Sequence, residues 1–123
     1  MERKVLVTGG AGFIGSNFLR LRVPRYQDLI FINIDKLTYA ANLDNLKEIS
    51  GYKNYYFIHG DIGSASTVNS LFRQGIDYVV HFAAESHVDN SIKAPQEVVF
   101  SNIMGCFNLL EAARAYGLTK FLQ

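Results

Sequence analysis

A glycine-rich segment near the amino terminus has the residue types and spacing of a phosphate-binding loop. Gly9, Gly12 and Gly15 lie in the run Thr-Gly-Gly-Ala-Gly-Phe-Ile-Gly, after a β-branched run and before an amphipathic stretch. Glycines allow a tight turn close to a pyrophosphate, and the amino terminus of the following helix offers N–H groups to it. A plain strand-to-helix loop is the alternative, which this context disfavours. No Gly-Lys-Ser/Thr follows, which excludes a Walker-type loop.

An acidic residue stands where a dinucleotide-binding fold places its ribose-binding carboxylate. Asp35 ends the second apolar run, twenty residues after Gly15. A carboxylate there accepts hydrogen bonds from the adenosine ribose and repels a 2′-phosphate, which favours NAD over NADP. The neighbouring Lys36 weakens this preference, because a cation partly neutralises the repulsion. Taken alone, an aspartate at a strand end is more often a helix or turn cap; joined to the glycines, it favours the ribose site.

The elements that must position these residues follow the pattern of an α/β fold. Short β-branched or aromatic runs alternate with amphipathic stretches, which predicts a Rossmann-type parallel sheet of about five strands in the order 3-2-1-4-5. NAD would then bind at the carboxyl edge, near the switch between strands one and four. The predicted strands are Lys4–Thr8, Leu29–Ile34, Tyr55–His59, Tyr78–Phe82 and Lys120–Gln123.

Three helices are expected to cover this sheet. The first follows the glycines, the second spans Ser64–Arg73, and the third runs from about Pro95 to Tyr116, where Gly117 suits a left-handed stop. Apolar residues at helical spacing mark the expected inner faces. They are Phe13, Ile14, Phe18 and Leu21 in the first helix, Val68, Leu71 and Phe72 in the second, and Val99, Ile103, Cys106, Leu110 and Ala113 in the third.

Composition bounds the class of protein. The 123 residues are 49% hydrophobic with a net charge of +1, which excludes intrinsic disorder and disfavours nucleic acid or an anionic membrane as a partner. The one cysteine forms no internal disulfide, and no His/Cys cluster has metal-ligand spacing, so we expect a soluble, cytoplasmic protein without a metal. We expect a single domain over residues 1–123, cut short where its last strand begins, with no substrate domain.

These residues together resemble the extended short-chain dehydrogenase/reductase superfamily, whose phosphate loop is T-G-x-x-G-x-x-G. Within it, the chain is most similar to the dTDP-glucose 4,6-dehydratases. The similarity lies in Asp-Lys-Leu-Thr-Tyr-Ala from position 35, Gly-Asp-Ile from position 60, and above all His-Phe-Ala-Ala-Glu-Ser-His-Val-Asp from position 81. It covers essentially the whole chain but only about the first third of a family member.

The resemblance implies a cofactor role for a set of positions. Phe13 and Ile14 correspond to the backbone contacts with the pyrophosphate, and Asp61 and Ile62 to the pair that holds the adenine. Asp35, Lys36, Leu37 and Thr38 correspond to the ribose cradle, Phe82, Ala83, Ala84, Glu85 and Ser86 to the crossing of strand four beneath NAD, and Ser101 to a hydroxyl that bonds the cofactor. Ser86 would also touch the sugar. Asn90 departs from the arginine of many members, so the resemblance leaves the sugar nucleotide open.

Each of these positions also has a structural interpretation. Ala83 and Ala84 suit plain sheet packing, and His81 is more often structural than catalytic, as is His87. Asp61 could cap the helix that begins near Ser64. Asp89 would cap or pair in the loop before the long helix, and Cys106, on the expected buried stripe, would be unreactive.

The family's catalytic groups are not found in these residues, so the prediction assigns no catalytic residue. The resemblance implies a Tyr-x-x-x-Lys pair and a Thr-Asp-Glu trio beyond Gln123. Tyr116 and Lys120 have the pair's spacing, but Gly117 between them should end the helix, so the match is interpreted as coincidental. We therefore expect no turnover from this chain alone.

Two classes of function remain open. The chain is either the NAD-binding part of a sugar-nucleotide dehydratase acting on dTDP-glucose, or a stand-alone dinucleotide-binding module without turnover. A related epimerase or decarboxylase is a third interpretation. The uncovered face of the long helix, and the dimer that the resemblance implies, predict self-association, with a homodimer as one form.

Overall fold

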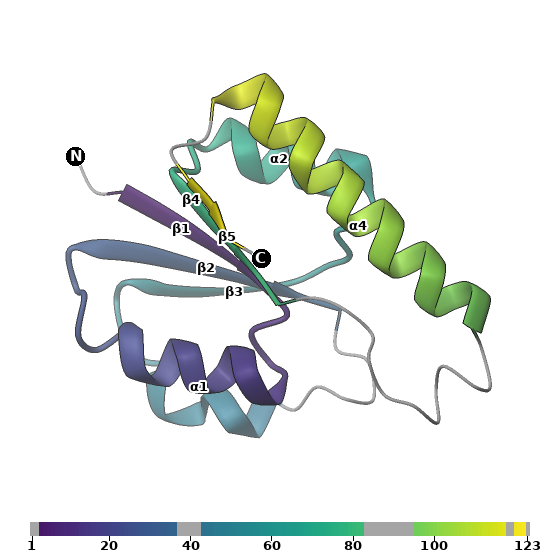
Figure 1. Ribbon diagram of the computed structural model, residues 1–123. Coiled ribbons are helices and arrows are strands. Elements are labelled where there is room, and N and C mark those ends of the chain that lie inside the picture. The colour runs from purple at the N-terminus through teal and green to yellow at the C-terminus, as the bar shows by residue number, and fades with distance from the viewer. Residues whose placement is uncertain (1–2, 37–42, 83–94, 118–119, 123) are drawn as a thin grey trace.

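Five parallel strands form one sheet in the order β3-β2-β1-β4-β5, as the sequence predicted (Figure 1). The computed structural model describes residues 3–36, 43–82, 95–117 and 120–122. The strands are β1 (Arg3–Thr8), β2 (Leu29–Asp35), β3 (Tyr55–His59), β4 (Tyr78–His81) and β5 (Lys120–Leu122). Their bounds agree with the predicted ones to within one residue. The predicted end of the last strand, Gln123, lies outside the described residues.

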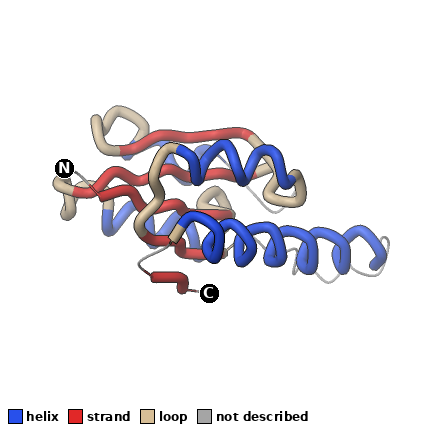
Figure 2. The backbone as a smooth tube through the Cα atoms, turned by 90° about the horizontal axis from the view of Figure 1, so that it is seen from above, coloured by secondary structure: helices blue, strands red, loops and turns tan. Residues whose placement is uncertain are grey.

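Helices cover both faces of this sheet. They are α1 (Phe13–Arg22), the 3₁₀ helix η1 (Leu43–Ile49), α2 (Ala65–Arg73) and α4 (Pro95–Tyr116). In Figure 1, α1 and η1 lie on one face while α2 and α4 lie on the other, and Figure 2 shows α2 and α4 side by side. The sequence did not predict η1. Gly117 ends α4 with a φ of 74°, which is the left-handed stop that the sequence predicted.

The core is divided by the sheet into two apolar clusters. Along β1, Leu6 packs toward α2 and α4, whereas Val5 and Val7 pack toward α1 and η1. Side chains of a strand alternate between faces, so a strand covered on both sides needs a continuous apolar run. The predicted inner face of α2 is confirmed, because Val68 and Phe72 are both buried, together with Leu71.

The predicted inner face of α1 is wrong at three of its four positions, because only Phe18 packs against the core. Phe13 and Ile14 are 78% and 67% exposed, and Leu21 is exposed too, whereas the helix buries Gly15, Ser16 and Leu19 against the sheet. The reason is steric: a Cβ on Gly15 would lie 2.5 Å from the carbonyl oxygen of Gly9. Small residues must therefore face the sheet where α1 begins.

The predicted stripe of α4 is wrong at Ile103 and Leu110 for a related reason, whereas Ala113 packs against the core as predicted. Ile103 and Leu110 are 61% and 50% exposed, and Cys106 is only partly buried. The buried positions are Gly105, Asn108, Leu109 and Ala112. Gly105 lies against Ile62, where a Cβ would be 2.7 Å from the Ile62 Cδ1 atom, so a small residue faces inward at this position. The side chain of Val99 lies outside the described residues.

We expect Gly15→Ala to destabilise the fold, because the nearest atoms to the new methyl group are backbone atoms that cannot move aside. The cost should be about 1–3 kcal/mol of unfolding free energy, measured by urea denaturation. Gly51→Ala is the matched control, since nothing lies within 4 Å of a Cβ at that position. Equal denaturation midpoints for the two variants would contradict this account of the packing of α1.

Candidate dinucleotide-binding site

The carboxyl ends of the central strands bring the predicted site residues to one edge of the sheet. Thr8, the last residue of β1, is in register with Ile34 of β2 and with His81 of β4. The loop of residues 9–12 leaves this point and leads directly into α1 (Figure 1). Asp35 follows Ile34 and is in register with His59 of β3. The structure therefore brings the glycine loop and Asp35 together, as predicted.

The glycine loop is a tight turn held by backbone hydrogen bonds. Gly9 adopts a φ of 71°, a left-handed conformation that favours glycine, and its N–H donates to the Ile34 carbonyl at 2.9 Å. The Gly12 amide donates to the Gly9 carbonyl at 3.2 Å. Gly12 is also the N-cap of α1, with an extended backbone and no side chain to cap the helix. Among the described residues, no side chain caps the amino terminus of α1.

Three successive backbone amides of the glycine loop have hydrogen-bond acceptors nearby. Those of Gly10, Ala11 and Gly12 donate to the Asn33 side chain, the Asp35 side chain and the Gly9 carbonyl, respectively. The first helical hydrogen bond runs from the Ser16 amide to the Gly12 carbonyl at 2.9 Å.

The backbone amides of Phe13, Ile14 and Gly15 lie between those of Gly12 and Ser16, and they donate to no described residue. Such amides, at the positive end of a helix dipole, are suited to bind an anion. The contacts predicted for Phe13 and Ile14 stay predictions, and this geometry is consistent with them.

Asp35 is buried at the end of β2, with 8% of its surface exposed. Its Oδ2 atom accepts the Ala11 amide at 2.9 Å, so the capping alternative is partly realised in the loop. A carboxylate has two oxygens and about four acceptor positions, so this bond is compatible with others from ribose hydroxyls. The backbone carbonyl of Lys36 lies 3.2 Å from the His59 Nε2 atom, which ties the end of β2 to β3.

The predicted adenine pair lies between β3 and α2 and is fixed by α4. Asp61 is exposed, and its Oδ1 atom accepts the Gly63 amide at 2.8 Å. The alternative that Asp61 caps α2 is wrong, because Ser64 is the N-cap and accepts the Thr67 amide. Ile62 is buried, and its carbonyl accepts the Asn108 Nδ2–H at 2.8 Å. The pair therefore sits in a loop with a defined conformation beside the sheet edge.

His81 takes a structural position at the end of β4. Its Nδ1 atom lies 2.6 Å from the Thr8 hydroxyl, which joins the ends of β1 and β4, and its side chain is buried. Burial lowers the pKa of His81 below its ordinary value, which favours the neutral ring. Phe82 follows, and its ring packs on that of Phe18 with centroids 5.5 Å apart.

Several predicted site residues lie outside the described part of the chain. These are Leu37, Thr38, Ala83, Ala84, Glu85 and Ser86, together with His87, Asp89 and Asn90. Ser101 lies on α4, but its side chain is likewise outside the description. Tyr116 ends α4 and Lys120 begins β5, which confirms that they do not share a helix.

Two buried amide side chains that hold the site were not predicted from the sequence. Asn33 binds the Gly10 amide, and Asn108 binds the Ile62 carbonyl. The available signal was a polar residue inside an otherwise apolar run, Leu-Ile-Phe-Ile-Asn-Ile in β2. Buried polar groups are costly without a partner, so such a residue indicates a specific hydrogen bond.

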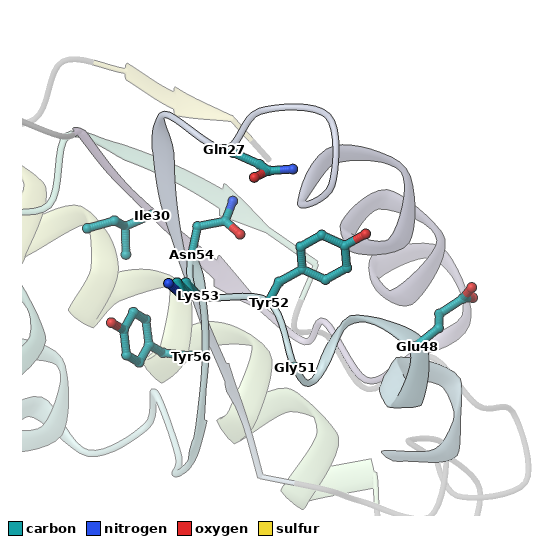
Figure 3. A pocket seen from close by; sticks show the side chains of 8 residues that line it. All are labelled: Gln27, Ile30, Glu48, Gly51, Tyr52, Lys53, Asn54 and Tyr56. Carbon is teal, nitrogen blue, oxygen red and sulfur yellow. The ribbon is translucent and has the colours of Figure 1, made fainter.

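A groove of about 750 Å³ lies away from this edge, where β2 and β3 begin (Figure 3). It is lined by Gln27, Ile30, Glu48, Gly51, Tyr52, Lys53, Asn54 and Tyr56. The buried Asn54 amide nitrogen is already occupied by the carbonyls of Val23, Tyr26 and Leu29. The described parts of the chain contain no group of His, Cys, Asp or Glu able to hold a metal ion, and none of their helices is long and apolar enough to cross a membrane.

Comparison with known proteins places this geometry among sugar-nucleotide enzymes. Residues 6–123 match the family described as GDP-mannose 4,6 dehydratase. A dTDP-glucose 4,6-dehydratase from Salmonella typhimurium is 49% identical over 114 residues, which are 92% of this chain and 31% of that protein. The mouse dTDP-D-glucose 4,6-dehydratase is 45% identical over 98% of this chain and 34% of its own length. The chain thus spans about a third of the relatives it matches.

Solved structures give the same result. The dTDP-glucose 4,6-dehydratase DesIV from Streptomyces venezuelae, determined with NAD bound, has a TM-score of 0.86 and 43% identity, covering 96% of this chain and 38% of that one. A UDP-glucose 4-epimerase from Thermotoga maritima has a TM-score of 0.82 and 32% identity, covering 96% and 36%.

We expect the stability of the fold to fall in mild acid because of His81. Since its pKa is lowered from 6.5 in the folded state, the unfolded state binds the proton more tightly, and stability declines as the pH falls through about 6.5. His81→Asn should flatten this decline between pH 7.5 and 5, measured by urea denaturation. A slope unchanged by His81→Asn would refute the assignment.

Proposed function

Because the chain belongs to the GDP-mannose 4,6 dehydratase family, we propose that it is the NAD-binding part of a dTDP-glucose 4,6-dehydratase. The observation that carries this proposal is the uncapped amino terminus of α1 beside the Asp35 carboxylate, in a chain 43% identical to an NAD-bound dehydratase of that kind. The 123 residues form one domain, and the sugar-binding part belongs to the remaining length of such an enzyme.

The residues present fit the adenosine and pyrophosphate portion of NAD. The amides of Phe13 and Ile14 would donate to the pyrophosphate, while Asp35 would accept from the adenosine ribose. The loop of Asp61 and Ile62 would hold the adenine. Gly9, Gly12 and Gly15 give the backbone its close approach. We assign to the same site the residues Lys36, Leu37, Thr38, Phe82, Ala83, Ala84, Glu85, Ser86 and Ser101, with Ser86 also on the sugar side.

In the proposed reaction, bound NAD would supply a hydride acceptor for the sugar C4 position and return that hydride to C6 after water has left across C5–C6. The contribution of this chain is to hold and orient the cofactor. We assign it no catalytic residue, because its one Tyr-x-x-x-Lys match is divided between α4 and β5. We therefore propose that these 123 residues bind NAD without converting dTDP-glucose.

A binding module without turnover and a fragment of a related epimerase are the alternative functions. The epimerase alternative has support from the Thermotoga maritima structure, whose identity of 32% is below the 43% of DesIV. We further propose a cytoplasmic location, since the single Cys106 forms no internal disulfide.

Titration calorimetry with NAD tests the site directly. We expect saturable binding, at least about tenfold weaker binding of NADP because of the Asp35 charge, and loss of binding in Gly12→Asp. Gly12 has an ordinary φ of −75° at the N-cap, where aspartate stabilises helices, so this variant should stay folded. Its carboxylate would occupy the place proposed for the pyrophosphate and repel it.

Gly12→Asn is the matched control, because it adds almost the same volume and a similar cap without the charge. It should bind NAD more tightly than Gly12→Asp. The absence of heat from a folded wild-type chain, or equal loss of binding in both variants, would contradict the proposed electrostatic role of the helix terminus.

Self-association through α4 is part of the proposal. Ile103, Phe107 and Leu110 recur on one face of the helix, and all three are exposed. We expect sedimentation to show a dimer that Phe107→Glu converts to a monomer. Leu21→Glu, on the exposed face of α1, is the control and should leave the dimer intact. A monodisperse wild-type monomer would exclude this interface.

A further inference from the structure

Asn33 is a fully buried amide in the middle of β2, with 0% of its surface exposed. Its Oδ1 atom accepts the Gly10 amide at 2.9 Å, and its Nδ2 atom donates to the Tyr55 hydroxyl at 3.2 Å. These two hydrogen bonds form what we call the Asn33 bridge, which links β3, β2 and the glycine loop. A backbone amide only donates, so the atom that faces Gly10 must be the oxygen.

The Asn33 side chain suits its two partners, because it offers an acceptor to the Gly10 amide and a donor to the Tyr55 hydroxyl. Asn33 shares its face of β2 with Phe31, which belongs to the buried apolar cluster that covers this side of the sheet. A buried amide there is costly unless both of its polar ends are bonded. The fit is also close, because a Cβ on Gly10 would lie 2.3 Å from the Asn33 Oδ1 atom. The site therefore holds the Gly10 backbone against the strand at a fixed distance.

The Asn33 bridge helps to determine which backbone amides of the glycine loop point toward β2. With Gly10 held by Asn33 and Ala11 held by Asp35, two successive N–H groups point into the protein. The chain must then enter α1 so that the amides of Phe13 and Ile14 are the first ones left for a ligand.

We propose that Asn33, oriented by Tyr55, is a positioning residue that sets the direction of the helix-terminal amides toward the dinucleotide pyrophosphate. This inference rests on the proposed function and adds to it a residue that does not touch the ligand. The Tyr55 phenol is suited to its part, because burial raises its pKa and the hydroxyl stays neutral.

The test uses Asn33→Leu, which keeps the volume and removes both hydrogen bonds. Amide hydrogen exchange followed by NMR reports on the ligand-free loop, and titration with NAD and with adenosine reports on the site. We expect the Gly10 amide to lose its protection while Ala11, held by Asp35, keeps its own. We also expect the dissociation constant for NAD to rise about tenfold while that for adenosine, which has no phosphate, changes by less than about twofold.

Ile32→Ala is the matched control, since it removes a buried side chain of the same strand on the opposite face of the sheet. It should lower stability without changing the ratio of the two dissociation constants. Tyr55→Phe is the second variant and serves if Asn33→Leu fails to fold. It should weaken Gly10 protection and raise the NAD constant about threefold.

Unchanged Gly10 protection in the variants would overturn the inference, as would equal weakening of NAD and adenosine binding. If the folded wild-type chain binds no NAD, the proposed function fails while the exchange data still decide whether Asn33 positions the loop. The two failures are therefore distinguishable.

Discussion

The close contact between the start of α1 and the end of β1 is the constraint on which the site depends. Gly15 lies so near the Gly9 carbonyl that a single methyl group would not fit, and Gly10 lies equally near Asn33. This contact places the helix terminus directly over the carboxyl edge of the sheet, where a parallel sheet leaves room for a ligand. It also explains why Phe13 and Ile14 are exposed: the side of α1 that faces the sheet at this point can carry only small residues.

The other end of the site depends on a second close contact, on the opposite face of the sheet. Gly105 lets α4 approach Ile62, and Asn108 fixes the Ile62 carbonyl. The same helix turns Ile103 and Phe107 outward. One helix therefore supports the loop proposed for adenine with one face and offers an apolar surface with the other, so the two properties are joined by a rigid element.

The strands could be predicted from the sequence because parallel strands covered on both faces are continuous apolar runs. Their order could be predicted because the glycine loop and Asp35 are typical of the dinucleotide-binding fold, whose strand order is known. The glycine loop was predictable for a similar local reason. The inner faces of α1 and α4 were not, because periodicity assumes that large apolar residues face the core. At Gly15 and Gly105 the close approach of the helix requires a small residue instead, and on α4 Leu110 is exposed while Asn108 is buried. Asn33 was missed because its partner, Gly10, is 23 residues away in the chain.

The proposed cofactor site is built mostly from backbone geometry, which tolerates changes in the surrounding sequence. The TM-scores against the dehydratase DesIV and against the Thermotoga maritima epimerase are 0.86 and 0.82, although the identities differ, at 43% and 32%. A fold that positions helix-terminal amides and one carboxylate is compatible with either chemistry. The choice between sugar nucleotides must then come from side chains that face the sugar, and the geometry of the glycine loop carries no information about it. Sequence identity therefore supports the proposal of a dehydratase, whereas the glycine loop and Asp35 support NAD as the cofactor.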